Sequence, residues 1–350
     1  MKHFKFDIVF TIVALLIASY WGYTHGGVGA MFSALFICVV LALMEVSLSF
    51  DNAVVNASVL KHWDKFWKTI FLTIGILIAV FGMRLVFPIV IVAVTADMGM
   101  TEVVKLALNN PTEYSAKLTA HHAEIAAFGG MFLLLVFLNF IFEDKDIQWF
   151  EWLESRLVKL GKVDAMSVFV AMVVLMISLS WVEEVHEPVV LMAGFAGILV
   201  YLGVNVLSSI LEGAGDDDDE PHESGLELSA VAKGGIAGFL YLEVLDASFS
   251  FDGVIGAFAI TNDVIIIMLG LAIGAMFVRS MTLFLVEKGT LDEFVYLEHG
   301  AHYAIGALAV IMLLSMKFPI PEIITGLIGI AFIVAAIIAS IKYKKAHATD

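Results

Sequence analysis

The sequence predicts an all-α polytopic membrane protein, and its composition is the first observation behind this prediction. Of the 350 residues, 61% are hydrophobic and only 15% are charged, which is too little polarity to cover a water-soluble surface at this length. The second observation is a series of about ten apolar segments, most of them near the ~20 residues with which a helix crosses a bilayer. The third is the one-sided distribution of lysine and arginine along that series.

The expected membrane spans follow one another along the chain. They lie near residues 7–23, 30–60, 69–94, 122–142, 165–182, 188–211, 234–260, 264–286, 299–316 and 320–341. The glycines after the first span offer no good small-residue cleavage site, so we expect this span to stay as an anchor. Apolar residues such as tryptophan and leucine alternate with charged residues through Glu143–Asp164. This pattern is typical of a helix that lies along the membrane–water interface. Four successive aspartates within Glu212–Gly225 predict an acidic loop.

The positive charges give the ten spans a direction. With the N-terminus placed inside, fourteen of the nineteen lysines and arginines fall on the cytoplasmic side and three fall outside. The other two, Arg84 and Arg279, lie within membrane spans. Because cytoplasmic loops carry an excess of lysine and arginine, this distribution predicts that both chain ends are cytoplasmic.

One phrase occurs twice inside long apolar segments, as MEVSLSFDNAVV at residues 44–55 and as LDASFSFDGVIG at residues 245–256. Superposing the two copies places each acid of one copy on an acid of the other. An ionisable side chain within a bilayer costs at least ~2.5 kcal/mol on insertion scales, so acids in a repeated pattern there indicate a functional site. In the expected topology the two copies run through the membrane in opposite directions.

The likeness between the two halves extends beyond this phrase. Gly75–Arg84 matches Gly270–Arg279, and His122 aligns with His299. Inverted repeats of three spans are the arrangement with which secondary transporters form a substrate site near the bilayer midplane. The expected organisation is therefore an anchor helix at 1–29, a first repeat at 30–142, an interfacial helix with two additional spans and the acidic linker at 143–233, a second repeat at 234–317, and a last span with a basic tail at 318–350.

The polar residues of the repeated phrase predict a metal-ion site. Carboxylate and amide oxygens without thiolates suit a hard divalent cation, such as manganese or magnesium, with calcium as a further candidate. The candidate ligands are Glu45, Asp51, Asn52, Glu243, Asp246 and Asp252. Since five carboxylates overcompensate a dication, we expect Arg84 and Arg279 to pair with some of them or to act as gating charges.

The spacing within each copy predicts interrupted helices. Glu45 and Asp51 are six residues apart, which on an unbroken helix turns one ~240° away from the other, so they converge only if the helix breaks between them. In the second copy, Gly253 and Gly256 are expected to allow a bend. Glu243 and Asp246, spaced three residues apart, are expected to share one helix face.

These motifs resemble the TerC (tellurium-resistance) family of integral membrane proteins, which is placed near the LysE exporter superfamily. The resemblance rests on the two acidic phrases, on FVRSMTLFLV at 277–286 and on YLEHGAHYAIGALAVIMLL at 296–314, and it covers most of residues 30–340. It implies a bacterial cytoplasmic membrane protein that exports Mn²⁺, with the six candidate ligands on the acidic positions of the family. The second phrase departs from the family, which often has Asp-Ser and a proline where this chain has Asp252 and Gly253.

We therefore expect a secondary transporter rather than an enzyme, without a permanent cofactor, that exchanges a divalent cation for protons. His122, His299 and His302 lie at helix ends and are candidates for a proton relay. Two alternatives stay open: a membrane scaffold or assembly factor in a metal or tellurium stress response, and an intramembrane aspartyl protease that uses Asp51 and Asp252. The bilayer and the cation are the expected partners, while a net charge of −16 without a basic patch argues against nucleic acid.

Overall fold

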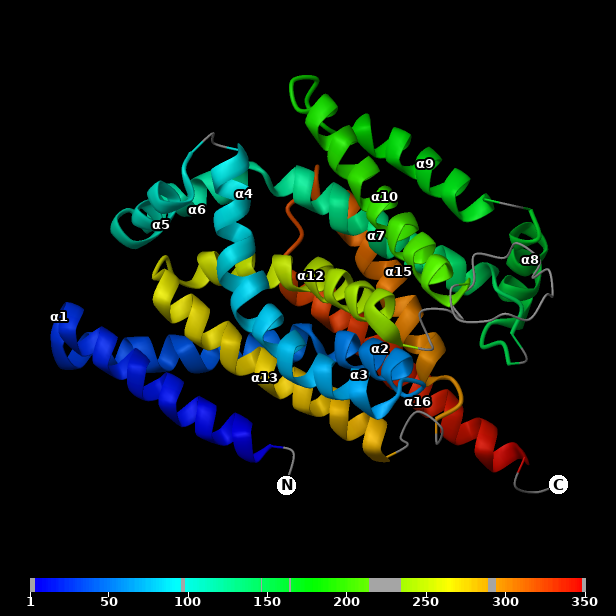
Figure 1. The fold of residues 1–350 in the computed structure, drawn as a ribbon, viewed down its shortest axis with the longest axis horizontal. Coiled ribbons are helices and arrows are strands. Elements are labelled where there is room, and N and C mark those ends of the chain that lie inside the picture. The colour runs from blue at the N-terminus through cyan, green and yellow to red at the C-terminus, as the bar shows by residue number, and fades with distance from the viewer. Residues whose placement is uncertain are drawn as a thin grey trace.

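The computed structural model describes residues 4–95, 98–145, 147–163, 165–213, 234–288 and 294–347. Within these ranges every regular element is a helix (Figure 1). This is the expected solution for apolar segments in a bilayer, because a helix satisfies its own backbone hydrogen bonds where water is absent. The acidic linker predicted within Glu212–Gly225 falls largely on residues 214–233, which lie outside the described residues, as does Asp164.

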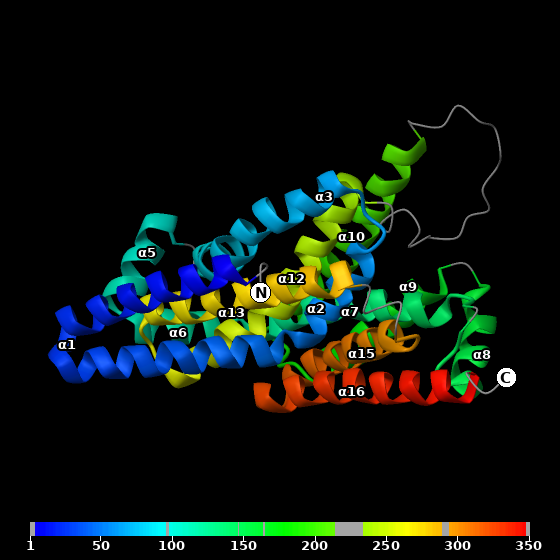
Figure 2. The ribbon, with the colours of Figure 1, turned by 90° about the horizontal axis from the view of Figure 1, so that it is seen from below.

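The first two expected spans form a helical hairpin. Helix α1 (Lys5–Leu48) is kinked at Gly26 and Gly27, where the backbone is not helical and Gly27 has φ = +71°. Glycine adopts this left-handed backbone without steric cost. The two limbs then pack closely at Gly22, where a Cβ would lie 2.8 Å from that of Ala34. Both limbs lie beside α13 (Val264–Lys288) in Figures 1 and 2, and Trp21 near the turn donates a hydrogen bond to Asp263 at 2.9 Å.

The first motif helix is interrupted, as its spacing predicts. Helix α1 ends at Leu48, Ser49 has φ = −102° and ψ = 17°, and α2 (Phe50–Leu60) begins at the next residue. The third expected span is continuous but changes its winding, because two of its segments are π-helical. Its parts are α3 (Lys65–Ile70), η1 (Phe71–Gly75), η2 (Ile78–Val86) and α4 (Phe87–Thr95).

The middle of the chain adds two short helices to the expected elements. The polar stretch before the fourth span, for which no element is predicted, folds as α5 (Met100–Asn109) and α6 (Pro111–Ala120). The fourth span is α7 (His122–Phe142), and the expected interfacial helix is the shorter α8 (Glu151–Gly161). Helices α9 (Met166–Leu179) and α10 (Glu187–Gly213) follow, with α9 bent by 102° from α8.

The last four elements include the second motif helix. They are α12 (Gly235–Ile260), α13 (Val264–Lys288), α15 (Leu297–Ser315) and α16 (Glu322–His347). The predicted interruption of the second motif is wrong, since α12 runs unbroken through it. The reason lies in packing: a Cβ at Gly253 would lie 3.0 Å from Oε2 of Glu45, so this glycine allows another helix to approach rather than the chain to bend.

Seven helices among the described residues are long and apolar enough to cross a membrane, or eight if the bent α8–α9 pair counts as one span. This defines a polytopic membrane protein, while the count of ten stays a prediction. Three helices account for the difference. Helix α1 is counted once although it is a hairpin of two limbs, α9 is short with 14 residues, and α12 contains three acids. Helices α7 and α15 pack against each other at the centre, and α12 crosses η2.

Candidate functional site

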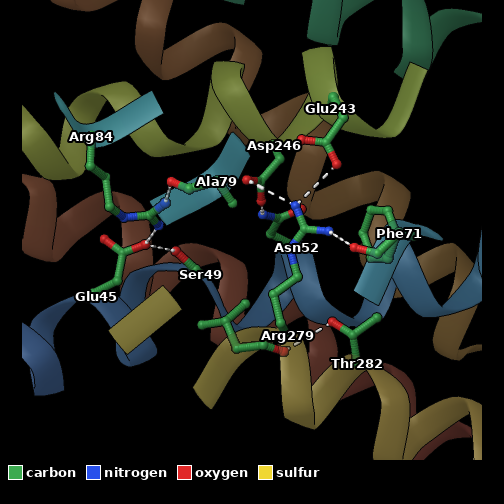
Figure 3. A network of polar contacts seen from close by, with 11 residues as sticks. Glu45, Ser49, Asn52, Phe71, Ala79, Arg84, Glu243, Asp246, Arg279 and Thr282 are labelled. Carbon is green, nitrogen blue, oxygen red and sulfur yellow. Dashed lines mark hydrogen bonds and ion pairs between the residues drawn. The ribbon is translucent and has the colours of Figure 1, made fainter. Parts of the chain in front are cut away.

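The two copies of the repeated phrase meet in the interior of the bundle (Figure 3). The first copy contributes the end of α1 and the start of α2, and the second contributes the middle of α12. Seven of the predicted site residues are between 1% and 6% exposed: Glu45, Asp51, Asn52, Arg84, Glu243, Asp246 and Arg279. Removing this many charges from water is unfavourable unless they are paired. Each of these acids except Asp51 is paired with an arginine.

Arg84 neutralises Glu45. Its Nη2 donates to Oε1 of Glu45, and its Nη1 donates to the carbonyl oxygen of Ala79 across the wide turn of η2. Ser49, at the helix break, donates its hydroxyl to the same Glu45 oxygen at 3.0 Å. The interruption of the first motif therefore supplies a hydrogen-bond donor to the buried acid, and π-helical turns of the kind that hold Arg84 are frequent at functional sites.

Arg279 forms ion pairs with two acids of α12. Its Nη2 lies 3.3 Å from Oε1 of Glu243 and 3.6 Å from Oδ2 of Asp246, which confirms that these two acids share one helix face. Nη1 donates to the carbonyl oxygen of Phe71 at 3.2 Å, and the guanidinium carbon lies 3.9 Å from the centre of the Phe71 ring. The guanidinium is thus held by two acids, one carbonyl and one aromatic face.

Two contacts relate the copies to each other in a reciprocal way. Asn52 of the first copy donates to Oδ1 of Asp246 at 2.7 Å. The residue aligned with Asn52 in the second copy is Gly253, where a Cβ would lie 3.0 Å from Oε2 of Glu45, the residue aligned with Asp246. Each copy therefore places the residue after its Phe-Asp pair against the first acid of the other copy. Arg84 and Arg279, which are aligned with each other, also each form an ion pair with an acid of their own half of the chain.

Asp51 is the one described acid of this site without an arginine. Its Oδ1 accepts the backbone N–H of Asn52 at 2.9 Å, and its Oδ2 faces α16, where a Cβ at Gly329 would lie 2.6 Å away. Asp51 lines a small pocket together with Glu45, so the break at Ser49 does bring these two acids to one cavity. The other lining residues come from four helices and the α1–α2 junction, and are Leu48, Ser49, Phe249, Gly253, Leu308 and Thr325.

The six predicted ligands do not form a preassembled metal site. No group of three or more His, Cys, Asp or Glu side chains in the described part of the chain could hold a metal ion as these side chains stand. Glu45, Glu243 and Asp246 instead form ion pairs with the two arginines. The backbone of Asp252 lies in α12, but its side chain is outside what the structure describes.

Several buried polar atoms of the site have no hydrogen-bond partner. They include Oδ1 of Asn52, Oε2 of Glu243, Oδ2 of Asp246 and both polar side-chain atoms of Asn56. Asn56 follows Asn52 by one helical turn on α2 and is 1% exposed. The sequence reasoning missed it, although an amide repeated four residues later inside an apolar span was a usable signal. Unsatisfied buried oxygens of this kind call for a ligand, an ion or water.

The histidines lie away from this network. His122 begins α7 and is partly exposed, whereas His299 and His302 are buried in the first turns of α15. His302 stacks on Phe140 with ring centroids 3.8 Å apart. Beside His299 lies Glu154 of α8, a fully buried acid that the amphipathic pattern assigns to the polar face.

Fold and site together define a polytopic helical membrane protein with a charge-paired carboxylate and arginine network in its interior. The chain matches, over residues 50–347, the model of a family described as "Protein of unknown function (DUF475)". It therefore belongs to this family. The comparisons with curated proteins and with solved structures find no match.

Proposed function

We propose that this protein is a secondary transporter that exports a divalent metal cation in exchange for protons. The observation that carries the proposal is Asp51, a buried carboxylate without an arginine partner that shares a cavity with Glu45. The preference for Mn²⁺ comes from the hard oxygen ligands and from the TerC resemblance. That relationship, the bacterial cytoplasmic membrane and the inverted repeat are parts of the same proposal.

The charges of the site support an exchange of one dication for two protons. Four acids with described side chains, Glu45, Asp51, Glu243 and Asp246, face two guanidinium groups, Arg84 and Arg279. Two negative charges are left over when all four acids are ionised. One divalent cation or two protons would each neutralise them, so the site keeps the same net charge with either occupant. Buried charge is costly in a bilayer, and this balance avoids it in both states.

The same stoichiometry cancels the free-energy cost of moving the cation outward against the membrane potential. Moving two charges outward against ~100 mV costs roughly 4.6 kcal/mol, at ~2.3 kcal/mol per charge. Two protons that move inward on the return step cancel this term, so that only the concentration gradients of metal and protons remain. An arginine pair would open to admit the ion: release of Glu45 by Arg84 gives the cavity a second carboxylate beside Asp51. Asn52, which follows Asp51 in the chain, also has an amide oxygen that no donor occupies.

Transport by purified protein tests this proposal. The full chain is reconstituted in liposomes, and Mn²⁺ movement is recorded with an imposed pH gradient. We expect Mn²⁺ movement driven by the proton gradient, and its loss in Asp51→Asn. Glu151→Gln is the matched control, because it makes the same type of change at an exposed position of α8. Undiminished transport by Asp51→Asn, with the control active, would contradict the site assignment.

One observation favours the alternative of a membrane scaffold or assembly factor. The arginine pairs leave no ready-made group of metal ligands among the described residues. Buried ion pairs can have a purely structural role, in which they fix how helices associate. The same liposomes distinguish the two functions. A scaffold would give no movement of any divalent cation in wild-type protein, and would instead retain a protein partner through purification.

A further inference from the structure

A second buried polar cluster lies at the N-terminal end of α15, outside the central network. It joins α15 to the amphipathic helix α8 through Glu154, which is completely buried. Oε1 of Glu154 accepts three hydrogen bonds: from the backbone N–H groups of Trp149 at 3.2 Å and Phe150 at 3.1 Å, and from the Tyr303 hydroxyl at 3.0 Å. These donors fix the orientation of the carboxylate and saturate one of its oxygens.

The other carboxylate oxygen faces a histidine across a gap. Oε2 of Glu154 lies 3.6 Å from Nε2 of His299, which is too long for a hydrogen bond. Within normal hydrogen-bond distances neither Oε2 of Glu154 nor Nε2 of His299 has a partner, although the backbone of Ile147 lies beside the imidazole. The His299 side chain is only 7% exposed. An oriented, buried carboxylate oxygen and an imidazole nitrogen that face each other unpartnered leave a place for a cation.

We propose that Glu154 Oε2 and His299 Nε2 bind a first-row divalent transition-metal ion, in a loading site for the central carboxylates. The role in loading rests on the proposed transport function, whereas the binding itself does not. The separation of the two atoms fits this: an ion about 2.1 Å from each would have a ligand angle of roughly 120°, within the range of metal sites with open positions.

The ligand types select the class of ion. Imidazole nitrogen with carboxylate oxygen suits manganese, iron, cobalt or zinc, whereas magnesium and calcium prefer oxygen ligands alone. Two protein ligands also predict weak and reversible binding, as a site that passes its ion on requires. No third His, Cys, Asp or Glu in the described part of the chain completes the site.

The charges around the cluster are mixed. Glu298 adds a partly exposed negative charge that is paired with Lys61, and Lys145 is a second nearby positive charge. Burial lowers the pKa of Lys145, although Glu154 and three other acids act in the opposite direction. Its ammonium group is engaged elsewhere: it donates to the carbonyl oxygens of Phe140 and Glu143 and lies 3.9 Å from the Phe140 ring centre. Lys145 therefore does not occupy the gap between Glu154 and His299.

Helix α15 connects this cluster to the central cavity. Leu308, which lines the cavity of Asp51 and Glu45, follows His299 by nine residues, or about 14 Å along a helix. The cluster also lies at the end of the molecule where Lys61 meets Glu298 at 3.8 Å, which the lysine distribution predicts to be cytoplasmic. An exporter takes up its ion from this side.

Binding of the metal alone to the purified full chain tests the inference. Mn²⁺ is titrated into protein in lipid nanodiscs, and bound ion is counted from the loss of the free Mn²⁺ resonance signal. We expect Glu154→Gln and His299→Gln each to weaken one Mn²⁺ site by about tenfold or more. Tyr303→Phe is the matched control, since it removes only a bond to the other carboxylate oxygen. Excess Mg²⁺ should not displace this ion.

The same titration separates this inference from the proposed function. Asp51→Asn should lose transport but keep the ion that depends on Glu154 and His299. If Glu154→Gln and His299→Gln bind Mn²⁺ as wild type does, or if Mg²⁺ competes equally, the loading site is refuted while the central site is untouched. Should Glu154→Gln not fold, because α8 loses its anchor, His299→Gln decides alone. Its carboxylate partner and the three donors to Glu154 remain in place.

Discussion

At the scale of single residues, the two buried guanidinium groups determine how the acids are distributed. Arg84 and Arg279 each bind an acid from their own half of the chain, and each also donates to a backbone carbonyl. A charge in this interior without its partner is far more costly than the absence of the pair, because the desolvation of the remaining charge is no longer offset. The single and the paired substitution therefore have different effects.

We predict that Arg84→Gln destabilises the protein by about 3–5 kcal/mol, because Glu45 stays buried without its partner. The double variant Arg84→Gln with Glu45→Gln should recover most of this loss. Unfolding in mixed micelles measures both, and Arg156→Gln on the exposed face of α8 is the control. Equal destabilisation by the single and double variants would show that Arg84 acts through packing rather than through the pair.

At the scale of elements, close helix contacts at glycine position the acids. Gly274 of α13 lies against Glu45, where a Cβ would come within 2.6 Å of Cγ of Glu45 and 2.9 Å of the Ala42 carbonyl oxygen. Both of these neighbours belong to the same rigid stretch of α1, which cannot move aside without separating the helices. Gly274 therefore sets the distance between α1 and α13 at the level of the site.

We predict that Gly274→Ala destabilises the protein by about 1–3 kcal/mol, as overpacking of a core does, and lowers Mn²⁺ transport because Glu45 is displaced. Gly203→Ala is the matched control: this glycine also lies in a helix, but a Cβ there meets nothing within 4 Å. Thermal unfolding and liposome transport are measured on the same preparations. A Gly274→Ala protein with the melting temperature and transport of the control would exclude this role.

The elements also show what the sequence could and could not predict. Helices α7, α12 and α13 lie within a few residues of the expected spans, because long apolar segments have only one way to satisfy their backbone in a bilayer. The π-helical winding around Arg84 was not predictable, since it depends on contacts with other helices. The unbroken course of α12 was missed for a related reason, because local spacing does not reveal that Gly253 faces Glu45.

The same limit applies to the sites. The carboxylates of the repeated phrase were found because they interrupt apolar spans, and their arginine partners were found for the same reason. Glu154 was missed because its surroundings look like those of a solvated amphipathic helix. What buries it are backbone donors from the preceding loop and Tyr303, which lies 149 residues further along the chain. No local pattern contains that contact.

At the scale of the whole molecule, the reciprocal contacts of the two copies support a two-fold relationship. Asn52 contacts Asp246, its counterpart Gly253 contacts Glu45, and the arginine helix of each half packs against the motif helix of the other. Two halves related in this way could rock against each other and open the same acids to either side in turn. For the proposed transport, the side that is cytoplasmic decides whether the ion would be exported or imported.

We predict that the Gly26–Gly27 turn is outside the cell and the α2–α3 turn inside, because the lysines gather at the latter. The test uses Cys38→Ser, which removes the single cysteine, with Gly29→Cys or Lys65→Cys added at exposed positions. A membrane-impermeant maleimide should label Gly29→Cys in intact cells and Lys65→Cys only after permeabilisation. The opposite pattern would place Glu154 and His299 on the outer face, where an ion from the cytoplasm cannot load, and both the export direction and the loading role would fall together.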